Sequence, residues 1–172
     1  ARIELVRTYV KLGRLNAAQE TLTAGMALAP DRPELLTVQG DLLAQQGESQ
    51  TAIDAYQAAL TANPAYWQAA EGLARLYLTQ GRPDLALNVA TTARATRPDV
   101  FHLHAIEGDA LRALGRGDEA LDAYRQAATL APPPASVNLD GETLADENLA
   151  TFLSDLQTRI GNVYLLQRNI SG

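Results

Sequence analysis

The sequence lacks cysteine, which excludes disulfide bonds, iron–sulfur clusters and zinc sites built from thiolates. It also lacks a run of basic residues, and its net charge is -6, so we do not expect it to bind nucleic acid. No apolar stretch approaches the roughly 18 residues that span a bilayer, so we do not expect direct insertion into a membrane. The cellular compartment stays open, because the absence of cysteine suits several compartments.

Aromatic residues are scarce as well, at 5% of the chain, and β-branched residues are sparse. The 47% of residues that are hydrophobic are mostly alanine and leucine, which favour helices over strands. A chain of 172 residues with this apolar content can bury a core of its own. Composition therefore predicts an all-α protein.

What the sequence does have is a period of 34 residues. One proline column, one glycine column and one alanine column keep this spacing through four successive copies: Pro30, Pro64, Pro98 and Pro132; Gly13, Gly47, Gly81 and Gly115; Ala18, Ala52, Ala86 and Ala120. Self-similarity at a fixed period of this length is the sequence signature of a stacked-repeat protein.

The second copy shows what one unit contains. Residues 33–46 have leucines at helical spacing, and Gly47 then suits the left-handed end of a helix. Residues 49–62 place apolar side chains on one stripe, and Pro64 ends this second helix because the residue before a proline avoids the α region. Pro83 falls at the first turn of a later second helix, where proline is tolerated.

The units resemble the tetratricopeptide repeat family. The second copy offers Leu36, Gly40, Leu43, Ala52, Tyr56, Ala59 and Pro64 at that family's signature positions, and the fourth offers His104, Gly108, Leu111, Ala120, Tyr124, Ala127 and Pro132. The third copy departs from the pattern with Ala90 in the aromatic slot. The resemblance implies a right-handed α-solenoid of antiparallel helix pairs, with an incomplete first unit at 1–32 and full units at 33–66, 67–100 and 101–134.

The period breaks after Pro132. Residues 133–142 begin with further prolines and predict a loop, whereas residues 143–172 predict a long amphipathic helix. Ile160, Gly161 and Tyr164 resemble the signature of a first repeat helix, but Gly161 arrives 19 residues later than the period predicts. We interpret this helix as the first helix of a further, incomplete unit. Since the chain also starts within a first helix, we expect a segment of a longer repeat protein.

The sequence offers no catalytic constellation. His102 and His104 point about 200° apart on one helix, so they cannot share a metal ion without distortion. Serines fall only at caps, loops and ends, none in a Gly-x-Ser-x-Gly setting. We therefore predict a protein that is not an enzyme and that needs no cofactor or metal.

The resemblance implies that first-helix positions line a concave, partner-binding groove. Carried onto this chain, the polar groove positions are Arg7, Lys11, Thr37, Asp41, Gln45, Gln68, Glu71, Arg75, Thr79, His102, Asp109 and Arg112. Their charge is mixed, and no groove position holds asparagine while Lys11 is the only lysine. This lining disfavours the clamp with which some family members hold the C-terminal carboxylate of chaperones.

Two functions fit these observations. The first is a scaffold that binds a partner peptide or helix of another protein in the groove. The second is a structural spacer, or an oligomerisation or regulatory module of a larger assembly or enzyme, in which the groove is unused. In that case the last helix, through Ile160 and Tyr164, offers a surface for self-association.

Overall fold

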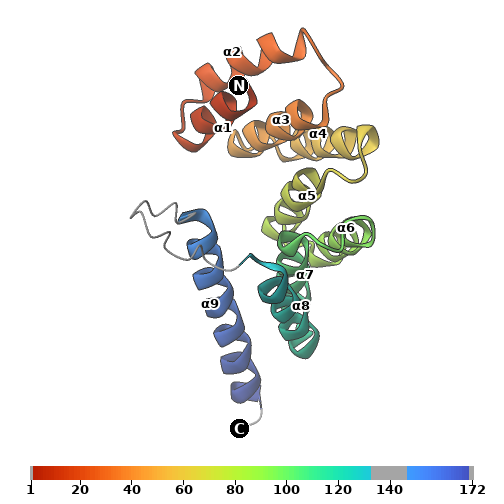
Figure 1. Ribbon diagram of the computed structural model, residues 1–172, viewed down its shortest axis with the longest axis vertical. Coiled ribbons are helices and arrows are strands. Elements are labelled where there is room, and N and C mark those ends of the chain that lie inside the picture. Colours follow the sequence, from red (N-terminus) through yellow and green to blue (C-terminus); the bar gives the residue numbers. More distant parts are fainter. Residues whose placement is uncertain (1, 133–146, 171–172) are drawn as a thin grey trace, which may run out of the picture.

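The computed structural model describes residues 2–132 and 147–170, where it contains nine α-helices and no strand (Figure 1). The helices are α1 (Arg2–Lys11), α2 (Leu15–Met26), α3 (Pro33–Gln45), α4 (Ser49–Ala62), α5 (Trp67–Thr79), α6 (Pro83–Thr96), α7 (Phe101–Ala113), α8 (Gly117–Leu130) and α9 (Glu147–Ile170). The prediction of an all-α helical repeat is confirmed.

The first eight helices form four hairpins, and the hairpins stack in chain order. Each odd-numbered helix packs on its own partner, and α1, α3, α5 and α7 also contact one another in succession. One wall of the molecule is therefore made of first helices, and each first helix places one face on this wall.

The turns inside the hairpins depend on glycine, as predicted. Gly13, Gly47, Gly81 and Gly115 all adopt positive φ angles, between 67° and 83°. At the second turn, the amide of Gly47 donates to the carbonyl of Ala44 and the amide of Glu48 donates to that of Leu43. Because any other L-residue is strained in this conformation, glycine fixes where each first helix ends.

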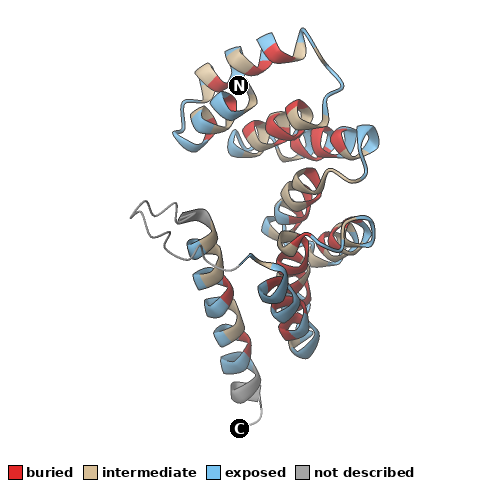
Figure 2. Ribbon diagram, in the orientation of Figure 1, coloured by how far each residue is buried: buried red, intermediate tan, exposed pale blue. Residues whose placement is uncertain are grey.

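Close packing within a hairpin depends on a second set of small residues. A Cβ atom on Gly40 would lie 2.6 Å from Cε1 of Tyr56, and one on Gly108 would lie 2.5 Å from Cε1 of Tyr124. Tyr124 is fully buried and Tyr56 nearly so. Figure 2 shows buried residues recurring along the stacked helices. Glycine on the first helix thus makes room for a tyrosine on the second.

Helix α9 packs against α8 through a buried stripe that includes Leu156 and Val163. The expected loop at 133–142 and the expected helix start at residue 143 lie outside the described residues. Gly161 does not repeat the role of Gly108, because it is exposed and no neighbouring atom lies within 4 Å of its would-be Cβ. The physical reason is that α9 has no following partner helix among the described residues.

None of the helices in the described part of the chain combines the length and the hydropathy that a bilayer crossing requires.

Candidate partner-binding groove

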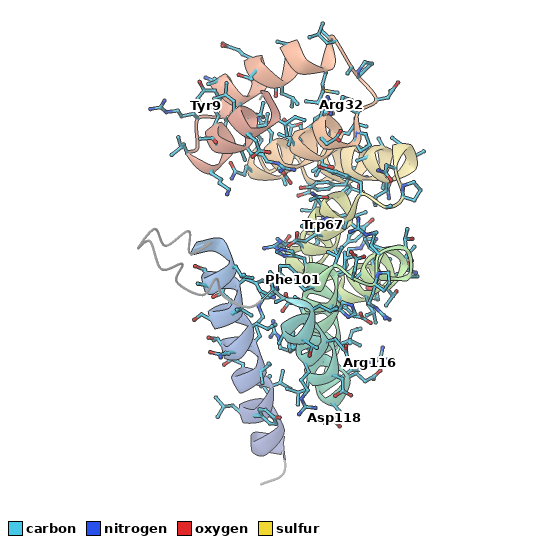
Figure 3. The ribbon with its side chains drawn as sticks, viewed as in Figure 1. Tyr9, Arg32, Trp67, Phe101, Arg116 and Asp118 are labelled. Carbon is cyan, nitrogen blue, oxygen red and sulfur yellow. The ribbon has the colours of Figure 1, made fainter. Side chains whose placement is uncertain are left out.

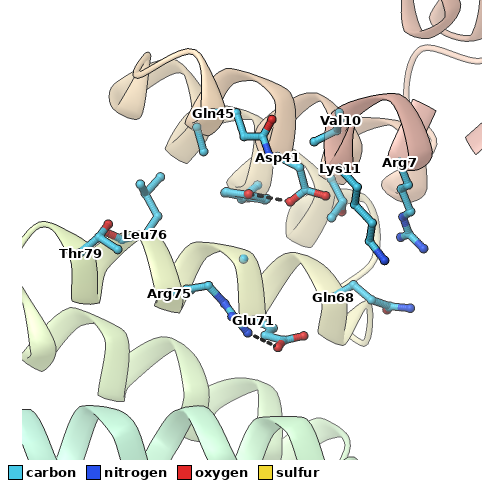
Figure 4. A pocket seen from close by; sticks show the side chains of 14 residues that line it. Arg7, Val10, Lys11, Asp41, Gln45, Gln68, Glu71, Arg75, Leu76 and Thr79 are labelled. Carbon is cyan, nitrogen blue, oxygen red and sulfur yellow. Dashed lines mark hydrogen bonds and ion pairs between the residues drawn. The ribbon is translucent and has the colours of Figure 1, made fainter. Parts of the chain in front are cut away.

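A groove with a volume of about 890 Å³ runs along α1, α3 and α5 (Figure 4). Nine of the sequence-predicted positions line it: Arg7, Lys11, Thr37, Asp41, Gln45, Gln68, Glu71, Arg75 and Thr79. They meet because they occupy equivalent positions on helices that lie side by side. The remaining three, on α7, do not line this groove.

Asp41 is the half-buried acid of the groove. The hydroxyl of Tyr56 donates a hydrogen bond to its Oδ1 at 2.8 Å. Burial raises the pKa of Asp41 above the usual value, and the hydrogen bond from Tyr56 opposes this shift. No other described residue donates to Asp41 or forms an ion pair with it, so one carboxylate oxygen is available from the groove.

The basic residues of the groove differ in how far they are neutralised. Arg75 donates to Oε1 of Glu71 at 2.6 Å, and Arg7 pairs with Glu4 at 3.4 Å. Lys11 is exposed and has no ion pair within the described ranges, and its side chain reaches into the groove (Figure 4). The groove therefore offers isolated charges of both signs.

The structure also adds groove residues that sequence reasoning missed, namely Tyr56, Gly72 and Leu76. Tyr56 is nearly fully buried, but its side chain lines the groove between α3 and α5. A Cβ on Gly72 would lie 2.7 Å from Cε1 of Tyr56, so glycine lets α5 approach this ring. Thr37 contributes little polarity, because its buried hydroxyl donates to the carbonyl of Pro33 at 2.7 Å.

His102 lies beside the groove, in a smaller cavity of about 180 Å³ between α5, α7 and α9. Its ring stacks on Phe101 with 4.1 Å between centroids and on Trp67 with 4.9 Å, where α5 and α7 face α9 (Figure 3). Burial lowers the pKa of His102, although Glu71 opposes the shift from 3.7 Å away. His102 thus packs as a largely neutral aromatic ring near neutral pH.

Asp109 and Arg112 are the other two predicted positions on α7. Asp109 accepts a hydrogen bond from the Tyr124 hydroxyl at 2.8 Å. It also forms an ion pair with Arg159 of α9 at 2.6 Å. Its side chain is only 15% exposed. Arg112 is exposed on the same helix. Helix α9 therefore covers the part of the wall that Asp109 occupies.

The described residues contain no cluster of three histidines or acids that could hold a metal ion. His104 is buried, and its Nε2 lies 2.9 Å from the carbonyl oxygen of Pro98. This contact gives His104 a packing role at the junction between α6 and α7.

Stacked hairpins whose first helices line a groove define an α-solenoid. The tetratricopeptide repeat model matches residues 3–70 and 71–134, and the chain belongs to this family. Tetratricopeptide repeat proteins are generally scaffolds for protein interaction and are typically not enzymes.

Solved structures agree with this assignment. The crystal structure of MamA is similar at 27% sequence identity and a TM-score of 0.63, and the match covers 75% of each chain. A thermophilic tetratricopeptide repeat protein of Thermus thermophilus, TTC0263, matches with a TM-score of 0.72 at 23% identity, over 95% of this chain and 80% of that one. At that identity the second likeness shows the fold alone. Comparison with curated proteins finds no significant match.

Proposed function

We propose that this chain is a scaffold that binds a peptide or helix of a partner protein in the groove along α1, α3 and α5. The observation that carries the proposal is the groove itself, at about 890 Å³ large enough to hold several side chains of a ligand. It is rigidly framed, because each lining helix is fixed by its own hairpin partner and by the neighbouring units.

The groove chemistry supports a protein ligand rather than a small cofactor. Charged and amide side chains are spread along three helices, among them Lys11, Gln45 and Gln68, and they alternate with apolar ones such as Val10 and Leu76. Such a spread fits an extended or helical segment, which presents polar and apolar side chains at intervals along its length.

A selection from a random peptide library displayed on phage tests this proposal. We expect the wild-type chain to enrich peptides, and Arg75→Glu to change their affinity about tenfold or more, because the reversal changes the charge of the groove lining beside Glu71. Arg116→Glu is the matched control, since Arg116 pairs with Glu119 on the surface outside the groove. Equal binding by Arg75→Glu and wild type would remove the groove from consideration.

The exposed end of α9 favours a second candidate, self-association. Tyr164, Leu165 and Leu166 are 49%, 61% and 52% exposed on consecutive positions. Light scattering of wild type and Leu165→Asp at increasing concentration tests it, with Asn162→Asp on the same helix as the control. A wild-type chain that stays monomeric at high concentration would rule this function out.

A further inference from the structure

The stack contains the same polar pair twice, 68 residues apart. Asp41 on α3 accepts from Tyr56 on α4, and Asp109 on α7 accepts from Tyr124 on α8, each through Oδ1 at 2.8 Å. Each aspartate follows the glycine that touches the ring of its tyrosine. The pairs therefore present their second oxygen from equivalent places on two first helices.

In the fourth unit that second oxygen is occupied. Nη1 of Arg159 donates to Oδ2 of Asp109 at 2.6 Å, and the Arg159 side chain is 29% exposed. Arg159 comes from α9, which lies on this unit through Leu156 and Val163. The chain thus contains its own example of a helix that brings an arginine to the Asp–Tyr pair.

In the second unit the equivalent oxygen faces the groove with no such donor among the described residues. Helix α5 is the next first helix there, and Gly72 is the residue that it places against Tyr56. A glycine supplies no cation, and Arg75, which α5 also carries, pairs with Glu71 instead. Asp41 is therefore a half-buried acid whose hydrogen bonding is incomplete.

The other basic residues near Asp41, namely Arg7 and Lys11, do not supply the missing cation. Arg7 is occupied by Glu4 and by the hydroxyl of Tyr66, whose oxygen lies 3.4 Å from Nη2 of the guanidinium. Lys11 is exposed, and a pair formed by an exposed lysine contributes little because water screens it. A ligand guanidinium that pairs with half-buried Asp41 forms a charge-assisted hydrogen bond, which is stronger than an exposed pair with lysine.

We propose that the groove selects partner segments that present an arginine, and that its guanidinium pairs with the free oxygen of Asp41 as Arg159 pairs with Asp109. This inference rests on the proposed function, because it names the ligand chemistry of the same groove. Arginine fits better than lysine, since a guanidinium is more weakly hydrated than an ammonium and therefore loses less hydration when it pairs with a half-buried carboxylate.

The test reads the sequences of the peptides selected from the phage library and measures their affinities. We expect enriched peptides to share an arginine, and replacement of that arginine by neutral citrulline to weaken binding about tenfold or more. Asp41→Asn should lose a similar factor, and citrulline should then have no further effect on Asp41→Asn. Asp54→Asn, an exposed acid on α4, is the control and should bind as wild type does.

The outcomes separate the two proposals. Groove-dependent peptides that lack arginine, or that bind Asp41→Asn at full affinity, would overturn this inference and leave the groove as the binding site. Failure to enrich any peptide whose binding depends on Arg75 would overturn both. Circular dichroism of Asp41→Asn confirms that the variant is folded before its affinity is interpreted.

Discussion

Two regions of the molecule carry the same Asp–Tyr pair in different surroundings. Around α3 and α4 the pair borders an open groove, whereas around α7 and α8 it is covered by α9. The local geometry is the same in both, with the same 2.8 Å hydrogen bond and the same glycine under the ring. What differs is the next helix along the stack.

The comparison shows that a repeat position does not have one fixed role. The ninth position of a unit is an acid that borders the groove at Asp41 and the acid of an ion pair at Asp109, because among the described residues only the second pairs with an arginine of the chain. Four predictions test how far this difference extends, and they are ordered from the largest expected effect to the smallest.

The largest effect is expected from Gly108→Ala. The new Cβ would lie 2.5 Å from the ring of Tyr124, which is fully buried and cannot move aside, so we expect a loss of about 1–3 kcal/mol in the free energy of unfolding. Gly40→Ala should lose a similar amount, since both regions have this contact. The measurement is urea denaturation of each variant.

Gly161→Ala is the control, because Gly161 also lies within a helix but has open space around it. It should gain up to about 1 kcal/mol, as alanine favours the helix. A loss in Gly161→Ala equal to that in Gly108→Ala would show that α9 packs as a complete unit does.

The next largest effect separates the two aspartates. Asp109→Asn removes the charge that Arg159 faces and should lower the free energy of unfolding by about 1–2 kcal/mol. Asp41→Asn should change it little at neutral pH, because Asp41 has no cation to lose among the described residues. Equal losses in the two variants, measured by urea denaturation, would contradict the distinction between an open and a covered pair.

Gly47→Ala and Gly115→Ala should behave alike. Both residues have positive φ angles, of 83° and 75°, and an alanine in this conformation costs about 1 kcal/mol. Thermal denaturation of the two variants checks that the scaffold is equivalent in the two regions. A loss at one turn alone would mean that the regions differ in their backbone as well as in their neighbours.

The smallest effect is expected in the pH dependence of stability. Burial raises the pKa of Asp41 in the folded chain, so the charged form is disfavoured by folding. Relative to Asp41→Asn, the wild type should therefore be most stable below about pH 4 and lose this advantage as the pH rises through the folded pKa. Urea denaturation of both chains between about pH 3 and pH 7 measures it. If the stability of the wild type relative to Asp41→Asn increased with pH instead, the result would mean that Asp41 pairs with a cation in the folded chain.

Much of the fold could be predicted from the sequence because its determinants are local. Gly47 ends α3 because glycine readily adopts the positive φ angle of the turn, and Pro83 stands at the start of α6. Neither effect depends on residues far away in the sequence. The resemblance to the tetratricopeptide repeat family implied that first helices line a groove, and nine of the predicted polar positions do line it. Tyr56 was missed as a groove residue because a side chain can pack inside and still present its edge.

The sequence by itself determined where the helices begin and end and which face of each helix is apolar, since both depend on residues a few places apart. Only the tertiary structure decided which of the polar positions stay open. Asp41 and Asp109 look equivalent in the sequence, and the difference between them lies 50 residues beyond Asp109, in the arginine of α9. An ion pair over that separation depends on how helices pack, which no local pattern specifies.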